Sequence, residues 1–102
     1  MTDAVLIDLL AQRVLGWGVS PDRYLLGRRS WIPKWRFNPL EKLDDAFKLL
    51  DHSKLSRYDI SMSGDGGFQV EIDVDGNVGK AAGEPKPRTI VLALARSLGL
   101  EV

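Results

Sequence analysis

Polar and apolar residues alternate along the second half of the chain in the pattern of β-strands. Between residues 68 and 74 every second residue is apolar, namely Phe68, Val70, Ile72 and Val74, and the residues between them are polar. This period of two predicts a strand with one buried and one wet face. Residues 58–63 alternate in the same way, and residues 78–82 form a weaker third run. Because the turns Gly64-Asp65-Gly66-Gly67 and Asp75-Gly76-Asn77 separate these runs, a three-stranded β-meander is expected.

A strongly apolar helix is predicted after the meander. Pro87 suits the first turn of a helix, and Gly99 suits the residue just past its end. Arg88 and Arg96 are the only charged residues between them, so the helix is apolar over most of its circumference. Helices of this kind are buried on more than one side. We therefore expect it to lie on the sheet and to contact another helix or the C-terminal residues.

Two amphipathic helices are predicted in the first half of the chain. Thr2 can cap a helix that runs to about residue 15, and Gly16 suits its left-handed end. Asn38 and Pro39 supply the cap and the first position of a second helix, and Glu41 completes a pair resembling a capping box. The second helix is expected to end near residue 51. Its predicted buried stripe consists of Leu40, Leu43, Phe47 and Leu50.

The segment between the first two helices is the least regular part of the chain. Pro21 and Gly27 are turn signals, and Pro33 interrupts any continuous strand. A hairpin in which residues 24–26 face residues 31–37 is one interpretation. A structureless loop of this length would be uncommon in a compact domain and is often functional.

Composition limits the classes of protein that the chain can represent. It has 102 residues, 44% hydrophobic and 27% charged, which fits a single globular domain over residues 1–102. Its 14 basic and 14 acidic residues cancel, so no global charge attracts nucleic acid or an anionic membrane. The absence of cysteine excludes disulfides and thiolate chemistry. No apolar run reaches the length of a membrane span, and no signal peptide is evident, so a cytoplasmic location is expected.

Three constellations look chemical but are better explained by structure. Residues 71–77 place acidic side chains at alternate positions, as in part of a calcium loop, but the twelfth position is Ala82 rather than a bidentate acid. His52 is the only histidine, and its place near a predicted helix end suits the helix dipole. The glycine-rich residues 64–67 lack the lysine of a phosphate-binding loop. No metal site and no cofactor are expected.

A basic and aromatic segment, residues 23–37, is the strongest candidate for function. Its basic residues are Arg23, Arg28, Arg29, Lys34 and Arg36, opposed only by Asp22, and Tyr24, Trp31, Trp35 and Phe37 lie among them. Three interpretations stay open. The aromatic residues can fill the edge of the core while the arginines are solvated or pair with Glu71 and Asp73. Alternatively, the segment can be a protein interface, where Trp, Tyr and Arg are enriched. It can also stack bases and hold phosphates of a single-stranded nucleic acid. The predicted contact residues are Arg28, Arg29, Trp31, Trp35 and Arg36.

Several of these segments, taken in order, resemble the phage ABA sandwich domain family of small phage and prophage proteins without assigned activity. The similar elements are residues 13–17, which end the first helix with Gly-Trp, Phe37-Asn38-Pro39, the hairpin 58–74, and residues 87–102, which contain the last helix and the segment 98–102 that closes it. Leu40 and Thr89 depart from the residues common in the family, which are Ser and Ala. The resemblance implies a three-layer α/β/α sandwich with the antiparallel sheet in the middle, and no catalytic residues. We therefore predict an α+β domain with the order ααβββα and helices on both sheet faces.

Three functional hypotheses follow. The leading one is a non-catalytic phage or prophage accessory protein, a monomer that binds an unidentified phage or host protein through residues 23–37. The alternative is a weak single-stranded nucleic-acid-binding protein that uses the same segment. An enzyme is the third, and it would need a cleft with titratable groups, for which Glu71 and Asp73 are the remaining candidates. The prediction is that the protein is not an enzyme.

Overall fold

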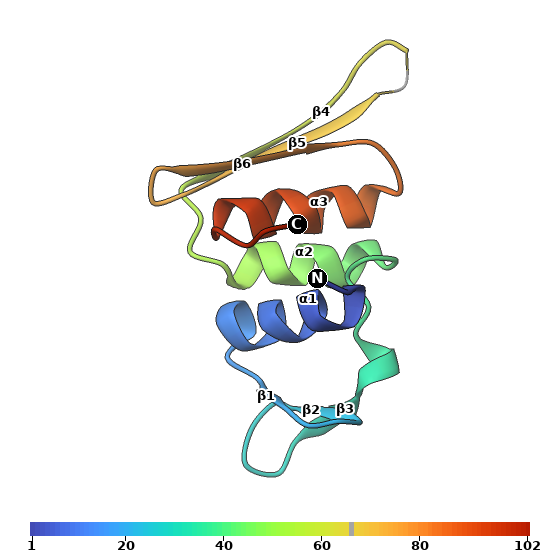
Figure 1. Ribbon diagram of the computed structural model, residues 1–102, viewed down its shortest axis with the longest axis vertical. Coiled ribbons are helices and arrows are strands. Elements are labelled where there is room, and N and C mark those ends of the chain that lie inside the picture. The colour runs from blue at the N-terminus through green and yellow to red at the C-terminus, as the bar shows by residue number, and fades with distance from the viewer. Residues whose placement is uncertain (66) are drawn as a thin grey trace.

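The molecule is a stack of layers with a β-sheet at each end and helices between them (Figure 1). The computed structural model describes residues 1–65 and 67–102. It contains three α-helices and two three-stranded antiparallel sheets, so the predicted α+β class is confirmed. From top to bottom, Figure 1 shows the sheet β4–β5–β6, helix α3, helices α2 and α1, and the small sheet β1–β2–β3.

The larger sheet is the predicted meander. Strands β4 (Arg57–Met62), β5 (Phe68–Val74) and β6 (Asn77–Ala82) pair in the order β4-β5-β6. Phe68, Val70 and Ile72 are buried, while Gln69 between them is exposed, as the alternation predicted. The tight turn after β5 places Gly76 at a positive φ of 85°. The turn expected at residues 64–67 includes Gly66, which lies outside the described residues.

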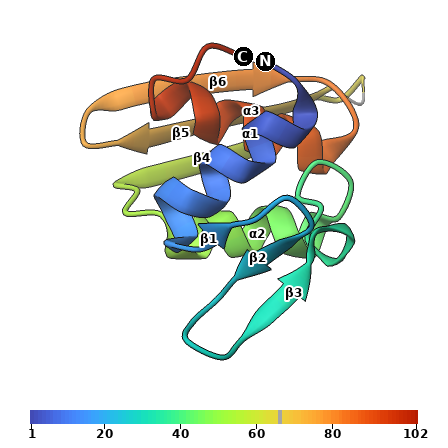
Figure 2. The ribbon, with the colours of Figure 1, turned by 60° about the horizontal axis from the view of Figure 1, so that its bottom comes forward.

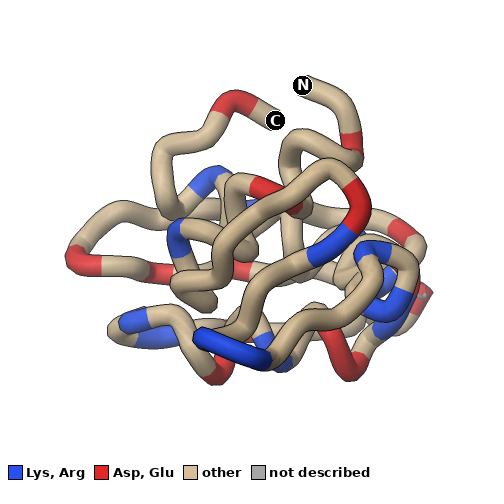
Figure 3. Tube along the Cα trace, turned by 90° about the horizontal axis from the view of Figure 1, so that it is seen from below, with Lys and Arg blue, Asp and Glu red and all other residues tan. Residues whose placement is uncertain are grey.

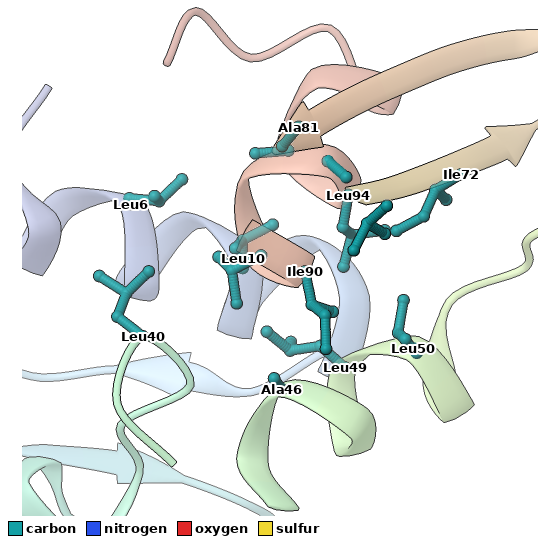
Figure 4. Close-up of a cluster of buried hydrophobic side chains, with 14 of the residues drawn as sticks. Leu6, Leu10, Leu40, Ala46, Leu49, Leu50, Ile72, Ala81, Ile90 and Leu94 are labelled. Carbon is teal, nitrogen blue, oxygen red and sulfur yellow. The ribbon is translucent and has the colours of Figure 1, made fainter. Parts of the chain in front are cut away.

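Helix α3 (Lys86–Ser97) is buried on two sides, as its apolar circumference predicted. One side packs on β5 and β6, and the other packs on α2. Figure 4 shows Ile90 and Leu94 of α3 between Ile72 of the sheet and Leu49 of α2. The helix ends at Gly99, whose φ of 82° lets the chain reverse so that the Leu100 amide donates to the Ala95 carbonyl.

The first helix begins where it was predicted, and its last part is a π-helical turn. Helix α1 (Asp3–Leu10) is capped by the Thr2 hydroxyl, which accepts a hydrogen bond from the Val5 amide. A π-helical turn over Ala11–Leu15 follows, and the helix ends at Gly16, which has a φ of 70°. This left-handed residue is the one predicted from the sequence.

The second helix begins later than predicted. Helix α2 covers Leu43–His52, whereas the prediction placed its cap at Asn38. Asn38 instead donates its backbone amide to the Asp45 carboxylate and its side-chain amide to Glu41, and residues 39–41 form a separate turn. Because the helix starts four residues further on, its buried face consists of Ala46, Leu49 and Leu50. Leu43, expected in the buried stripe, is 43% exposed.

The expectation of helices on both faces of the central sheet is wrong. All three helices lie on one side of β4–β5–β6 (Figure 1). The other face carries polar and charged side chains, including Asp59, Gln69, Glu71 and Lys80, which follow from the register of the strands. Covering these groups with a helix would remove them from water without compensating partners, which is costly. The layer on the far side of α1 and α2 is the small second sheet.

The small sheet forms where the sequence was least regular. Strands β1 (Gly18–Val19), β2 (Arg23–Leu25) and β3 (Trp31–Pro33) pair in that order, and a 3-10 turn, Lys34–Arg36, follows. Tyr24 lies opposite Ile32 in the β2–β3 hairpin. A hairpin is therefore present, but its second strand ends at Pro33 and not at residue 37 as predicted. A third short strand, which was not predicted, lies beside it.

Candidate functional site

The β2–β3 hairpin has one face toward the helices and one toward solvent (Figure 2). Tyr24 is buried, and Ile32 opposite it is half-buried. Leu25 and Trp31 form the next opposed pair, and both are exposed. Successive side chains of a strand point to opposite faces, so the inward position of Tyr24 directs Leu25 outward.

An aromatic cluster anchors the hairpin to the helices. Tyr24 and Phe37 are fully buried, and Trp17 packs against both. The ring centroids are 5.8 Å apart for Trp17 and Tyr24, 5.0 Å for Trp17 and Phe37, and 5.9 Å for Tyr24 and Phe37. These distances and the edge-on packing of Phe37 are those of favourable aromatic pairs. Two of the four aromatic residues in segment 23–37 are therefore structural.

A polar network ties the same hairpin to helix α1. The Tyr24 hydroxyl donates to one Asp8 oxygen at 2.7 Å, and the Lys34 ammonium donates to the other at 3.0 Å. Burial raises the pKa of Tyr24, and the hydrogen bond to the Asp8 carboxylate raises that pKa further. The phenol therefore stays protonated at neutral pH and serves as a donor.

The raised pKa of Tyr24 predicts a loss of stability in alkali. The unfolded chain releases this proton near the ordinary tyrosine pKa of about 10, while the folded chain retains it. The stabilising contribution is therefore complete below pH of about 10 and is lost as the pH rises toward the folded-state pKa. Urea unfolding between neutral pH and pH of about 11 should show a steeper decline for the wild type than for Tyr24→Phe. Equal pH slopes would contradict the assignment.

The basic residues of the segment divide into paired and unpaired groups. Arg23 forms an ion pair with Asp22 at 3.0 Å, and its guanidinium lies 4.3 Å from the centre of the Trp31 ring. Lys34 is engaged with Asp8. Arg28, Arg29 and Arg36 are exposed, and the structure gives them no ion pair among residues 1–65 and 67–102. Figure 3 views this end of the molecule and shows basic segments along the hairpin.

The five predicted contact residues all lie at the surface. Trp35 is 75% exposed and Trp31 is 52% exposed, although one face of the Trp31 ring is covered by Arg23. Leu25 and Leu26, which the sequence reasoning missed, are also exposed. The alternation after Tyr24 was the signal that could have identified Leu25. We call the following set the hairpin surface: Leu25, Leu26, Arg28, Arg29, Trp31, Trp35 and Arg36.

A cleft of about 470 Å³ adjoins the hairpin surface beside Trp35. Its apolar lining comes from α1, Phe37 and Leu40. Of the charged residues that line it, Lys34 pairs with Asp8, and Glu41 accepts a hydrogen bond from the Asn38 side chain. Arg88 forms a two-bonded ion pair with Asp3, and this hydrogen-bonded contact lowers the pKa of the Asp3 carboxyl. The cleft therefore combines apolar surface with charged groups that are already bonded within the protein.

The remaining candidates from the sequence have structural roles. The Asp73 carboxylate accepts a hydrogen bond from the Gly76 amide, which closes the β5–β6 turn. The His52 Nδ1 atom lies 2.9 Å from the Lys48 carbonyl oxygen in the last turn of α2. In the described part of the chain no group of three or more His, Asp or Glu residues is close enough together to hold a metal ion. Within the same residues no helix is long and apolar enough to cross a membrane.

A larger hollow, about 660 Å³, lies over the wet face of the main sheet. Asp59, Glu71, Lys80 and Arg96 contribute to its lining. Arg96 uses its guanidinium to donate to the Lys80 carbonyl at 2.7 Å, and Arg57 lies 4.0 Å from Glu71. Both Glu71 and Asp73 are half-buried rather than fully solvated, and each already has a partner within the sheet.

The fold has a counterpart among solved protein structures. No protein-family profile and no curated protein matches the sequence. A crystal structure of a phage protein from Bacillus cereus has a similar fold, with a TM-score of 0.77 over 100% of this chain and 92% of the other. The two sequences are 16% identical over this alignment. The likeness therefore shows a shared architecture.

Proposed function

We propose that this chain is a non-catalytic accessory protein of a phage or prophage, related to the phage ABA sandwich domain family, and that it binds another protein through the hairpin surface. One observation carries the proposal: Trp31 on the β2–β3 hairpin and Trp35 in the 3-10 turn after it are exposed, and three arginines of the same segment have no ion pair in the described chain. Tryptophan and arginine are the residues most enriched among interface hot spots. The fold of the Bacillus cereus phage protein supports a phage origin.

The chemistry of the hairpin surface defines the kind of partner it fits. Three arginines call for carboxylates on the partner, which they can bind through two parallel hydrogen bonds. Trp35, together with the apolar cleft beside it, calls for an apolar side chain that packs against the indole. We therefore propose an acidic protein surface with a protruding apolar residue, met in the cytoplasm of the host bacterium.

The arrangement of polar groups supports a binding role rather than catalysis. Tyr24, Asp8 and Lys34 form the best-connected polar group near the cleft, and their polar atoms are bonded to one another. A general base or nucleophile needs a group that is free to exchange a proton with a substrate. The Tyr24 phenol is held in its protonated form by burial, which raises its pKa, and by Asp8.

The test replaces exposed residues of the hairpin surface and measures the affinity for the captured partner. Tagged protein is used to capture partners from a lysogenic or infected host, and the captured partner is then titrated against purified variants. Trp35→Ala and the double variant Arg28→Ala/Arg29→Ala are expected to lose at least about 30-fold in affinity, the size of an interface hot spot. Both should unfold at the wild-type temperature because the replaced side chains are exposed.

The matched controls replace one charged and one apolar side chain that are exposed elsewhere on the molecule. Lys80→Ala and Val78→Ala replace exposed side chains of strand β6, in the sheet at the other end of the molecule, and should leave the affinity unchanged. Capture of the same partners at equal affinity by the wild type and by all hairpin variants would exclude this surface as the interface.

A single-stranded nucleic acid is the second candidate, favoured by the same unpaired arginines and by the exposed Trp31 and Trp35 in one segment. Bases stack on exposed aromatic rings, and arginines neutralise phosphates. Binding of this kind weakens steeply as salt rises because counterions are released. Titration of short labelled oligonucleotides at low salt distinguishes the two: salt-sensitive binding that Trp35→Ala abolishes supports the nucleic-acid role, and the absence of any binding excludes it.

A further inference from the structure

Strand β4 is an open sheet edge at the end of the molecule opposite to the hairpin surface (Figure 1). Its six residues pair with β5 without interruption, so no bulge protects the edge, and the strand contains no proline or lysine. Proteins usually protect edge strands with such features because unpaired peptide groups template the addition of another strand. The apolar face of β4 is also open: Met62 is 58% exposed and Tyr58 is 50% exposed.

The other edge strand of the same sheet, β6, is bonded by a side chain of helix α3. Arg96 of α3 reaches the outer edge of β6 and donates to the Lys80 carbonyl at 2.7 Å. The same side chain lies 3.4 Å from the carbonyl of Val102 in the C-terminal tail. One carbonyl of the β6 edge is thus bonded by a side chain of the protein itself, and the described residues place no strand beside β4.

The pairing of β4 with β5 determines which N–H and C=O groups of β4 point to the open edge. The Ser63 amide donates to the Gly67 carbonyl, which continues the register of the hairpin. In an antiparallel ladder alternate residues direct their N–H and C=O groups to the same neighbour. Tyr58, Ile60 and Met62 therefore direct these groups away from β5, toward the open edge.

We propose that β4 pairs antiparallel with β4 of a second copy of this chain, with Ile60 opposite Ile60 at a two-fold axis. In this register Tyr58 of each copy lies opposite Met62 of the other, and the three outward-facing residues of each strand can exchange backbone hydrogen bonds. The exposed apolar side chains of both copies then form one continuous face. The result is a six-stranded sheet, in place of the monomer expected from the sequence.

Among the registers in which β4 can pair with a second copy, charge favours this one. Asp59 lies opposite Glu71 within the sheet, an unfavourable pair of like charges at the edge. With Ile60 at the axis, Asp59 meets Ser61 of the second copy, whose hydroxyl can donate to the carboxylate. A register centred on Asp59 would oppose two carboxylates. One centred on Tyr58 would need the Ser56 amide, which already donates to the Asp73 carbonyl at 2.8 Å.

In the proposed dimer residue 60 of one copy lies opposite residue 60 of the other, and the experiment replaces this residue. The mass of the full chain in solution is measured by sedimentation, and the wild type is expected to form a dimer with a micromolar dissociation constant. Ile60→Lys and Ile60→Asp each place like charges at the axis and should be monomers. An equal mixture of the two variants should form a dimer, because an ammonium group then faces a carboxylate across the axis. A wild-type monomer, or homodimers of both variants, would overturn the proposal.

A cysteine test gives an independent reading if the charged variants fail to fold. The chain has no cysteine, so Ile60→Cys introduces a single thiol. Opposed residues of a hydrogen-bonded antiparallel pair have Cα atoms about 5.5 Å apart, within the range of a disulfide. Mild oxidation should cross-link Ile60→Cys much faster than Val78→Cys, an exposed control on β6. Equal rates for the two variants would also overturn the proposal.

Discussion

Replacing Gly79 with alanine is expected to lower the free energy of unfolding by about 3 kcal/mol, the upper end of the cost of overpacking a core. Gly79 lies on β6 where helix α3 approaches the sheet most closely. A Cβ atom at this position would lie 2.1 Å from the Ala93 carbonyl oxygen and 2.4 Å from the Ser97 amide nitrogen. Both atoms belong to the helix backbone, so neither can rotate away, and the helix must separate from the sheet.

Urea denaturation of the wild type and of Gly79→Ala measures this effect. Gly27→Ala is the matched control, because a Cβ at Gly27 has no atom within 4 Å and its backbone is not left-handed. That control should change the stability by less than about 0.5 kcal/mol. If both substitutions had equal effects, close packing of β6 on α3 would not be the cause.

Replacing Phe37 with alanine is expected to cost about 3–5 kcal/mol, the usual loss for a large buried aromatic residue. Phe37 is 2% exposed and packs edge-on against Trp17 and Tyr24. Its removal leaves a cavity between the hairpin and the helices and releases the small sheet from its anchor. The unfolding midpoint in urea should fall accordingly. In a Trp31→Phe/Trp35→Phe background, which leaves Trp17 as the single tryptophan, the fluorescence should report a more exposed indole.

The neighbouring tryptophan provides the contrast. Trp35 stands two residues before Phe37 and belongs to the same basic and aromatic segment, but it is largely exposed. Trp35→Ala should therefore change the stability by less than about 0.5 kcal/mol. A large loss from Trp35→Ala would show that it is structural and would weaken the proposed hairpin surface.

The meander and the last helix were predictable because local patterns specify them. Alternation from Phe68 to Val74 and the turn at Asp75-Gly76 need no information from distant residues. The start of α2 was mispredicted for the opposite reason. Asn38, Pro39 and Glu41 make a good local helix start, but Asp45 accepts the Asn38 amide, and this competing contact forms a turn instead.

The residue types of the candidate site were predictable from the sequence. Which of these residues are buried or paired, and which are free at the surface, was not. The sequence identified segment 23–37 as rich in arginine and aromatic residues. Only folding pairs Lys34 with Asp8, which is 26 residues away, and so removes it from the set of free cations. In the same way, the packing of Trp17 on Tyr24 and Phe37 separates the buried aromatic residues from Trp31 and Trp35.

By itself the sequence determined the α+β class, the three paired strands, the capped first helix and the two-sided burial of the last one. Each depends on the period of apolar residues or on a residue suited to one backbone conformation, and these are local properties. Only the tertiary structure decided which face of the sheet is covered, which arginines lack partners and which edge stays open. Those outcomes depend on contacts between residues far apart in the chain, such as Arg96 with Lys80 and Arg88 with Asp3.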